Sequence, residues 1–192
     1  TKVLMVVSGD TGGHAQTVDK ASLDESAGDA NTLAALKTKL EALQPVLAEP
    51  LDLDEVTPAD YDRVFYPGGH GPMEDLAVNE TSARILTERM EKSAPVAVLC
   101  HAPAAVLATE NAPGHSPFAG RKMSFPNEEE RIGGLAEKGP WLLEERLVNL
   151  GVAYTKAPEP WVSYVVVDGN LYTGQTPSSS RELAECLVED LN

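Results

Sequence analysis

The chain has 192 residues, a formal net charge of −15 at pH 7 and 42% hydrophobic residues, which is typical of a folded globular protein. Such a charge repels phosphate backbones and anionic lipid surfaces, so we expect neither nucleic acid nor a membrane as partner. No apolar run approaches the ~18 residues of a membrane span. The two cysteines form no disulfide framework, and we therefore expect a cytoplasmic protein.

The first half of the chain predicts two strands and two helices. Lys2 to Val7 and Arg63 to Tyr66 are short apolar runs, the pattern of buried parallel strands. Residues 31–47 carry leucines at helical spacing, which predicts an amphipathic helix. Asn79 is a suitable N-cap for a second helix over residues 80–92.

The second half continues the alternation. Val96 to Leu99 predicts a third strand, and the alanine-rich segment through Thr109 predicts a helix. Later segments predict a strand at 122–125, a helix at 141–150, strands at 161–167 and 171–173, and a helix at 181–191. Ser179 and Glu182 have the spacing of a capping box for that last helix. Alternating strands and helices imply an α/β sheet covered on both faces, within one domain over residues 1–192.

The most informative position is Cys100, which directly follows the third strand and precedes His101. A thiol at a strand-to-helix turn is the counterpart of the nucleophile elbow in hydrolases. Backbone N–H groups and the positive end of a helix dipole favour a thiolate there. The alternative is an inert cysteine in the core, and we assign Cys186 on the last helix to that class.

A second turn, at Gly68-Gly69, follows the preceding strand, and sites in open α/β sheets form beyond such carboxyl ends. Glycine permits close approach of backbone donors, so Gly69 N–H and His101 N–H are candidate oxyanion donors. His101 is the candidate imidazole partner of the thiol. The acid that orients it is expected in the run Asn127 to Glu130, although such a run is usually a solvated surface. No histidine or cysteine spacing indicates a metal site.

Three segments resemble the ThiJ/PfpI superfamily, whose fold is like that of class I glutamine amidotransferases. They are Tyr66–Met73, Leu99–Pro103 and Asp168–Ser180. The resemblance is greatest to the branch of heat-shock chaperones and glyoxalase III, and runs from about Val18 to the C-terminus. It implies a flavodoxin-like three-layer sandwich with a mostly parallel central sheet, in a homodimer.

The resemblance also implies site residues. Cys100 is the nucleophile, His101 its partner and Glu130 the acid, with Gly69 and His101 as backbone donors. The remaining expected residues line the rim of the pocket: Gly68, His70, Glu74 and Trp161. Relatives often have an aromatic residue where Glu74 stands.

The chain departs from the family in the segment at about residues 8–17. Relatives carry there a helix, with a glutamate that hydrogen-bonds the cysteine, and a further strand. Ser8 to Thr17 is too short for both and has no such glutamate.

The resemblance implies a glutathione-independent glyoxalase that needs no cofactor. It would convert a small carbonyl compound, methylglyoxal, to D-lactate through Cys100, with activity reduced by the missing glutamate. A stress-related chaperone or a thiol redox sensor is the alternative. A thiol amidotransferase or peptidase is less favoured, because the class carries a His-x-Glu pair far downstream of its cysteine. The only histidine beyond His101 is His115, and it is not followed by that pattern.

Overall fold

The computed structural model of the chain describes residues 2–9, 28–134, 137 and 141–189. The structure divides into two compact units, which are described separately. One unit is Thr1–Ser8 with Thr57–Asn192, and the other is Gly9–Val56. The expectation of a single domain stays a prediction.

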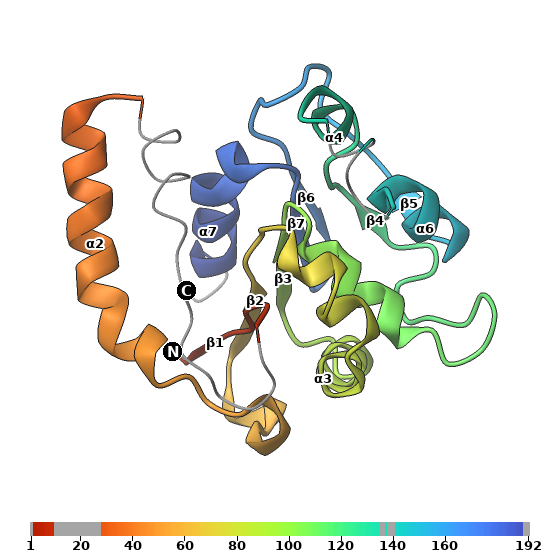
Figure 1. Cartoon of the computed structure of the whole chain (residues 1–192). Coiled ribbons are helices and arrows are strands. Elements are labelled where there is room, and N and C mark those ends of the chain that lie inside the picture. Colours follow the sequence, from red (N-terminus) through yellow and green to blue (C-terminus); the bar gives the residue numbers. More distant parts are fainter. Residues whose placement is uncertain (1, 10–27, 135–136, 138–140, 190–192) are drawn as a thin grey trace. The chain divides into compact units, whose positions relative to one another are not determined.

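The larger unit contains a five-stranded sheet in the order β1-β2-β3-β7-β6 (Figure 1). Its strands are β1 (Val3–Met5), β2 (Arg63–Tyr66), β3 (Val96–Leu99), β6 (Val165–Asp168) and β7 (Leu171–Gly174). The first four in spatial order run parallel, and β6 pairs antiparallel with β7. The α/β class and the mostly parallel central sheet are therefore confirmed.

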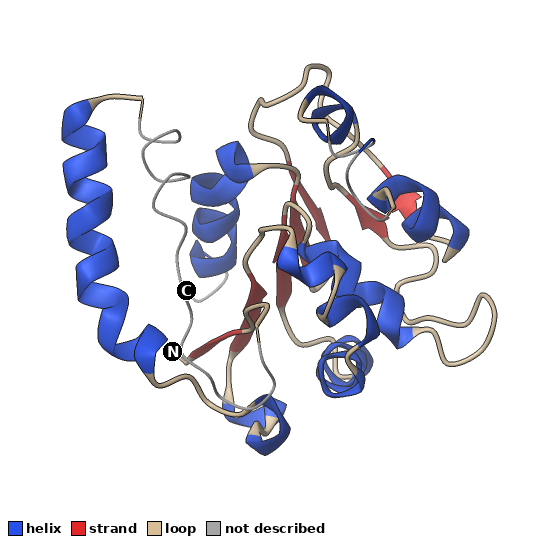
Figure 2. Cartoon of the chain, viewed as in Figure 1, coloured by secondary structure: helices blue, strands red, loops and turns tan. Residues whose placement is uncertain are grey.

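Helices cover both faces of this sheet (Figure 2), which explains why β3 is buried along its whole length. On one face lie α3 (Glu80–Glu91) and the 3-10 helix η5 (Ala102–Thr109), and on the other lies α7 (Ser180–Glu189). Continuous apolar runs are what such doubly covered strands require. The three-layer arrangement brings the carboxyl ends of β2 and β3 together at one edge.

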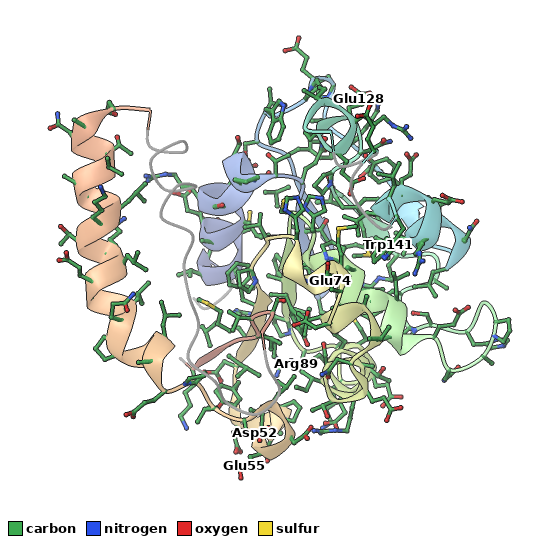
Figure 3. The ribbon with its side chains drawn as sticks, in the orientation of Figure 1. Asp52, Glu55, Glu74, Arg89, Glu128 and Trp141 are labelled. Atoms are coloured by element: carbon green, nitrogen blue, oxygen red, sulfur yellow. The ribbon has the colours of Figure 1, made fainter. Side chains whose placement is uncertain are left out.

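Helix α3 begins and ends as its sequence indicates. The side chain of Asn79 accepts a hydrogen bond of 2.7 Å from the Ser82 N–H, which caps the helix. Leu86 and Met90 face the core. Near its end, the buried guanidinium of Arg89 donates to backbone carbonyl oxygens of the loops that precede β2 and β3 (Figure 3).

Three expected elements differ from the structure. The strand expected at 122–125 is β4 (Lys122–Met123), and it pairs with β5 (Ala153–Tyr154) in a separate two-stranded sheet. The strand expected at 161–167 begins only at Val165, because Trp161 has a φ of +64°, a left-handed conformation that a strand does not contain. The helix expected at 141–150 is α6 (Leu143–Asn149), with Gly151 following at a φ of +97°.

The expected capping box of the last helix is wrong. Ser179 ends η6 (Pro177–Ser179), and its hydroxyl donates to Tyr164 O and accepts from Tyr164 N–H. Glu182 accepts a hydrogen bond from Ser163. Both side chains therefore hold the segment before β6, a tertiary role that local spacing does not reveal. The end of the expected helix, residues 190–191, lies outside the described residues.

The smaller unit contains α2 (Ala30–Ala48) and the 3-10 turn η1 (Leu53–Glu55). The expected helix is thus present, and Asp29 caps it by accepting from the N–H groups of Asn31 and Thr32. None of its residues is buried. The short remaining helices of the larger unit are η2 (Pro58–Asp60), η3 (Gly71–Met73), η4 (Leu76–Val78) and α4 (Glu128–Ile132). Among the described helices, none is both long and apolar enough to cross a membrane.

Candidate active site

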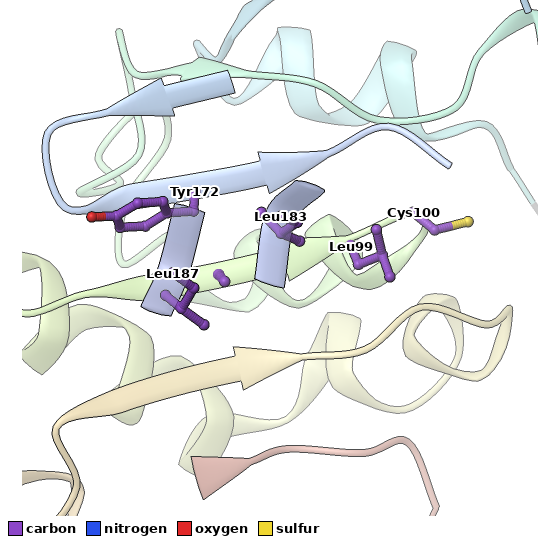
Figure 4. Close-up of a cluster of buried hydrophobic side chains, with 6 residues drawn as sticks. Leu99, Cys100, Tyr172, Leu183 and Leu187 are labelled. Carbon is purple, nitrogen blue, oxygen red and sulfur yellow. The ribbon is translucent and has the colours of Figure 1, made fainter. Parts of the chain in front are cut away.

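Cys100 lies at the carboxyl end of β3 in a strained turn. Its φ is +56°, which is rare for any residue other than glycine, and such strain clusters at functional sites. The Cys100 N–H donates to Gly174 O at 2.8 Å, which fixes the turn to β7. Figure 4 shows the Cys100 sulfur pointing past the end of the strand and away from Leu99 and Leu183. The Cys100 side chain is buried at the edge of an apolar cluster that includes Leu99, Tyr172, Leu183 and Leu187. Its sulfur atom does not point into that cluster.

The two glycines of the neighbouring turn have different roles. A Cβ on Gly68 would lie 2.7 Å from the Cβ of Cys100, so only glycine fits against the thiol-bearing residue. Gly69 has open space at its Cβ position but a φ of +101°, which favours glycine on conformational grounds. Of the two glycines, it is therefore Gly68 that makes the expected close approach, and it does so to Cys100.

Three of the expected residues form a continuous line of polar contacts. The Cys100 Sγ lies 3.2 Å from Nδ1 of His101, and His101 Nε2 lies 3.0 Å from Oε1 of Glu130. The Glu130 side chain is fully buried, and the His101 side chain is 8% exposed. Cys100 and His101 come from the β3–η5 turn, and Glu130 comes from α4, so the fold joins segments thirty residues apart in number. This arrangement matches a nucleophile, an imidazole in contact with it and a carboxylate that orients the imidazole.

Electrostatics favour a charged His101 ring. Burial disfavours the imidazolium, but the contacts with Cys100 and Glu130 outweigh burial and raise the pKa of His101 to about 9. The ring is therefore protonated at pH 7. The Cys100 sulfur is therefore in direct contact with a positively charged ring.

His70 stands beside this charged ring. The ring centroids of His70 and His101 are 4.6 Å apart. Burial, and then the positive charge of His101, lower the pKa of His70, against a smaller opposing effect of Glu130. The two neighbouring imidazoles are thus in different protonation states at pH 7, one neutral and one charged, which is the arrangement of a base and an acid.

Two backbone amides near the sulfur are available as donors. Within the described parts of the chain, neither the Gly69 N–H nor the His101 N–H donates a backbone hydrogen bond. Gly69 lies in the turn after β2, and His101 follows Cys100 in the turn after β3. Amides in such positions can stabilise negative charge that develops on a substrate oxygen.

A second buried carboxylate, Glu129, was not expected. Its Oε1 accepts hydrogen bonds from Gln175 Nε2 at 2.7 Å and from the Trp161 N–H at 3.2 Å. Burial raises the pKa of Glu129, but hydrogen bonds from its own backbone N–H, from the N–H groups of Trp161 and Asn127 and from Gln175 outweigh burial and lower it. Glu129 therefore fixes the left-handed turn at Trp161 beside α4. Three consecutive glutamates carry no local signal that tells which of them are buried.

The outer rim residues are exposed. Glu74 follows η3, where its N–H donates to Gly71 O (Figure 3), and Trp161 is half exposed. Their place on the rim of a substrate pocket stays a prediction. Trp141, by contrast, packs against a cation, with Arg146 4.5 Å from its ring centroid.

The shortened segment is described only at its start. Ser8 Oγ donates to the carboxylate of Asp75, with oxygen distances of 2.9 and 2.8 Å. A Cβ on Gly71 would lie 2.1 Å from this hydroxyl, so the end of β1 packs tightly on η3. Residues 10–17 of the segment lie outside the described residues. Among the residues that are described, no three His, Cys, Asp or Glu side chains are grouped so as to hold a metal ion.

Comparison with known proteins identifies relatives of the chain. It is similar to the protein/nucleic acid deglycase HchA of Pseudomonas aeruginosa, with 32% identity over 161 residues, which are 80% of this chain and 54% of that protein. It is also similar to glyoxalase 3 of Candida albicans, with 31% identity over 149 residues, which are 74% of this chain and 61% of that protein. The chain thus spans about half the length of the curated HchA relatives that it matches.

Solved structures agree with these matches. The Rapid Encystment Protein of 24 kDa from Francisella tularensis superimposes with a TM-score of 0.80 and 28% identity, covering 94% of this chain and 78% of that one. Glyoxalase III from Candida albicans superimposes with a TM-score of 0.64 and 26% identity, covering 88% of this chain and 68% of that one. The model of the DJ-1/PfpI family matches residues 17–190. The chain therefore belongs to the DJ-1/PfpI family.

Proposed function

We propose that the chain is a glutathione-independent glyoxalase, which converts methylglyoxal to D-lactate at Cys100. The observation that carries this proposal is the line of contacts from Cys100 through His101 to the buried Glu130. Relatives named glyoxalase 3 and deglycase support an enzymatic role of this kind in the family.

The first step uses the thiolate and the backbone donors. The sulfur of Cys100 adds to the aldehyde carbon of methylglyoxal, which forms a C–S bond and places negative charge on the aldehyde oxygen. The N–H groups of Gly69 and His101 stabilise that charge. The imidazolium of His101 then supplies a proton to the oxygen, which gives a neutral hemithioacetal.

The second step moves a proton between neighbouring carbons. Neutral His70 is the nearest uncharged imidazole to His101, and we assign to it removal of the proton from the carbon bonded to sulfur. Return of that proton to the adjacent ketone carbon passes through an enediol and leaves a lactoyl thioester on Cys100. Attack by water then releases lactate and regenerates the thiol. Methylglyoxal and water are the only reactants, so the electrons balance without an external oxidant or reductant.

The matched pair of cysteines tests this function. Cys186 on α7 is partly buried against the cluster under the sheet and stands outside the line of contacts. We expect Cys100→Ser to abolish D-lactate formation from methylglyoxal and Cys186→Ser to retain it, in an enzymatic D-lactate assay. Equal rates in Cys100→Ser and the parent protein would remove the basis of the proposal.

A redox-sensing role is the second candidate, because a cysteine sulfur in contact with a positively charged imidazole is a suitable target for oxidation by peroxide. Under dilute peroxide, sulfinic acid on Cys100 in a protein that makes no D-lactate would favour sensing over catalysis. A homodimer also remains a proposal, tested by light scattering coupled to size-exclusion chromatography.

A further inference from the structure

A second polar site lies at the opposite edge of the sheet from Cys100. An open pocket of about 590 Å³ is formed where β2, β3 and β7 begin. Arg63 starts β2, Pro95 precedes β3, and Asn170 lies in the turn between β6 and β7. Figure 4 shows the Tyr172 ring at the turn end of β7, with Cys100 at the far end of β3. We call this cavity the amino-end pocket.

Arg63 is the unusual member of the pocket. It is only 5% exposed, and its Nε is buried without a hydrogen-bond partner. In the described ranges of the chain, its guanidinium makes neither an ion pair nor a hydrogen bond. A buried polar nitrogen without a partner is costly, because it has lost water and gained no hydrogen bond in exchange.

The neighbouring guanidiniums differ in that they do make hydrogen bonds, although Arg89 Nε is also buried without a partner. Arg89 donates to four backbone carbonyl oxygens, at 2.6 to 3.3 Å. Arg121 pairs with Asp168 at 3.1 Å and reaches the side chain of Asn170 at 3.4 Å. Burial, and then the positive charge of Arg63, lower the pKa of Arg89, against the charge of Asp62. Cations are thus concentrated here in a chain whose net charge is −15.

We propose that the amino-end pocket binds a small molecule through an oxyanion group, a phosphate or a carboxylate, held by the Arg63 guanidinium. The planar guanidinium presents paired N–H donors that match two oxygens of such a group. The volume is in the range of pockets that hold small molecules, so the occupant is larger than a bare ion. Pro95 and Gly169 also line the pocket and provide uncharged surface for the rest of it.

The test compares the melting temperature of the full chain in phosphate, acetate and chloride at one ionic strength. Anything that binds only the folded state raises its melting temperature in a saturable way. We expect phosphate or acetate, but not chloride, to raise the melting temperature of the parent protein. The anion that raises it shows whether the pocket recognises a phosphate or a carboxylate group. Arg63→Met should lose the response, and Arg84→Met should keep it. Arg84 is an exposed residue of α3 that pairs with Glu88 on the surface.

Titration calorimetry with the responding anion gives the dissociation constant. Loss of paired, charge-assisted hydrogen bonds predicts that Arg63→Lys binds about tenfold more weakly or worse, and this variant replaces Arg63→Met should the latter not fold. The proposal is overturned if neither phosphate nor acetate raises the melting temperature of the parent protein in a saturable way relative to chloride. So does an Arg63 variant that responds as the parent does.

Discussion

Replacing Glu130 by glutamine removes one of the two contacts that hold the His101 ring in its charged form. The Glu130 carboxylate is fully buried, 3.0 Å from His101 Nε2. Glutamine keeps nearly the same shape but carries no charge. We therefore expect the pKa of His101 to fall in Glu130→Gln.

The size of the change follows from the geometry. Burial opposes the charge on His101, yet its pKa is raised from 6.5 to about 9 by Cys100 and Glu130 together. Loss of an opposite charge at this distance lowers a pKa by about 1 to 3, which places the variant between about 6 and 8. The ring of the parent is about nine-tenths charged at pH 8, whereas that of the variant would be at most about half charged.

NMR titration of the imidazole nitrogens measures this pKa without substrate. Glu128→Gln is the matched control, because Glu128 is an exposed residue of the same helix that pairs with Lys156. It should leave the His101 pKa unchanged. A Glu130→Gln protein whose His101 still titrates near 9 would refute the electrostatic reasoning.

Three further predictions concern stability and pH. Gly68→Ala places a Cβ 2.7 Å from that of Cys100, so we expect a loss of about 1–3 kcal/mol in urea unfolding and slower D-lactate formation. Unchanged stability and activity in Gly68→Ala would contradict the close packing of Gly68 on Cys100. Arg89→Met leaves four carbonyl oxygens without their donor and should cost about 3 kcal/mol or more, whereas a neutral effect would show that water replaces it. The raised pKa of His101 stabilises the fold fully below pH 6.5, and this contribution is lost as pH rises through about 9. This contribution amounts to about 3 kcal/mol of the free energy of unfolding. The rate of D-lactate formation should fall over the same pH range, because the imidazolium is lost there. A free energy of unfolding that does not change with pH in this range, in the parent protein and in Glu130→Gln alike, would contradict this prediction.

The central strands could be predicted from the sequence because a doubly covered parallel strand is a continuous apolar run. β2 and β3 are such runs, and each leads into a turn of the site. The strand-to-helix turn then placed Cys100 and His101 without further information. These features depend on local pattern and on the general rule that sites form at the carboxyl ends of strands.

Other features depend on contacts between distant segments, and local pattern missed them. The spacing of Ser179 and Glu182 is that of a capping box, but both side chains hold the segment before β6. In the run of three glutamates, Glu128 is exposed, whereas Glu129 and Glu130 are buried and have partners that come from the segment after β7 and from the β3–η5 turn. Composition cannot distinguish a solvated acidic run from one that supplies a buried carboxylate to the candidate site.

The central claim is that Cys100 attacks the substrate carbonyl, and acid-quenched peptide mass spectrometry during turnover of methylglyoxal tests it most directly. The account predicts an adduct with the mass of one methylglyoxal on the peptide that contains Cys100 and none on the peptide that contains Cys186. Steady D-lactate formation with Cys100 unmodified, or from Cys100→Ser protein, would contradict it.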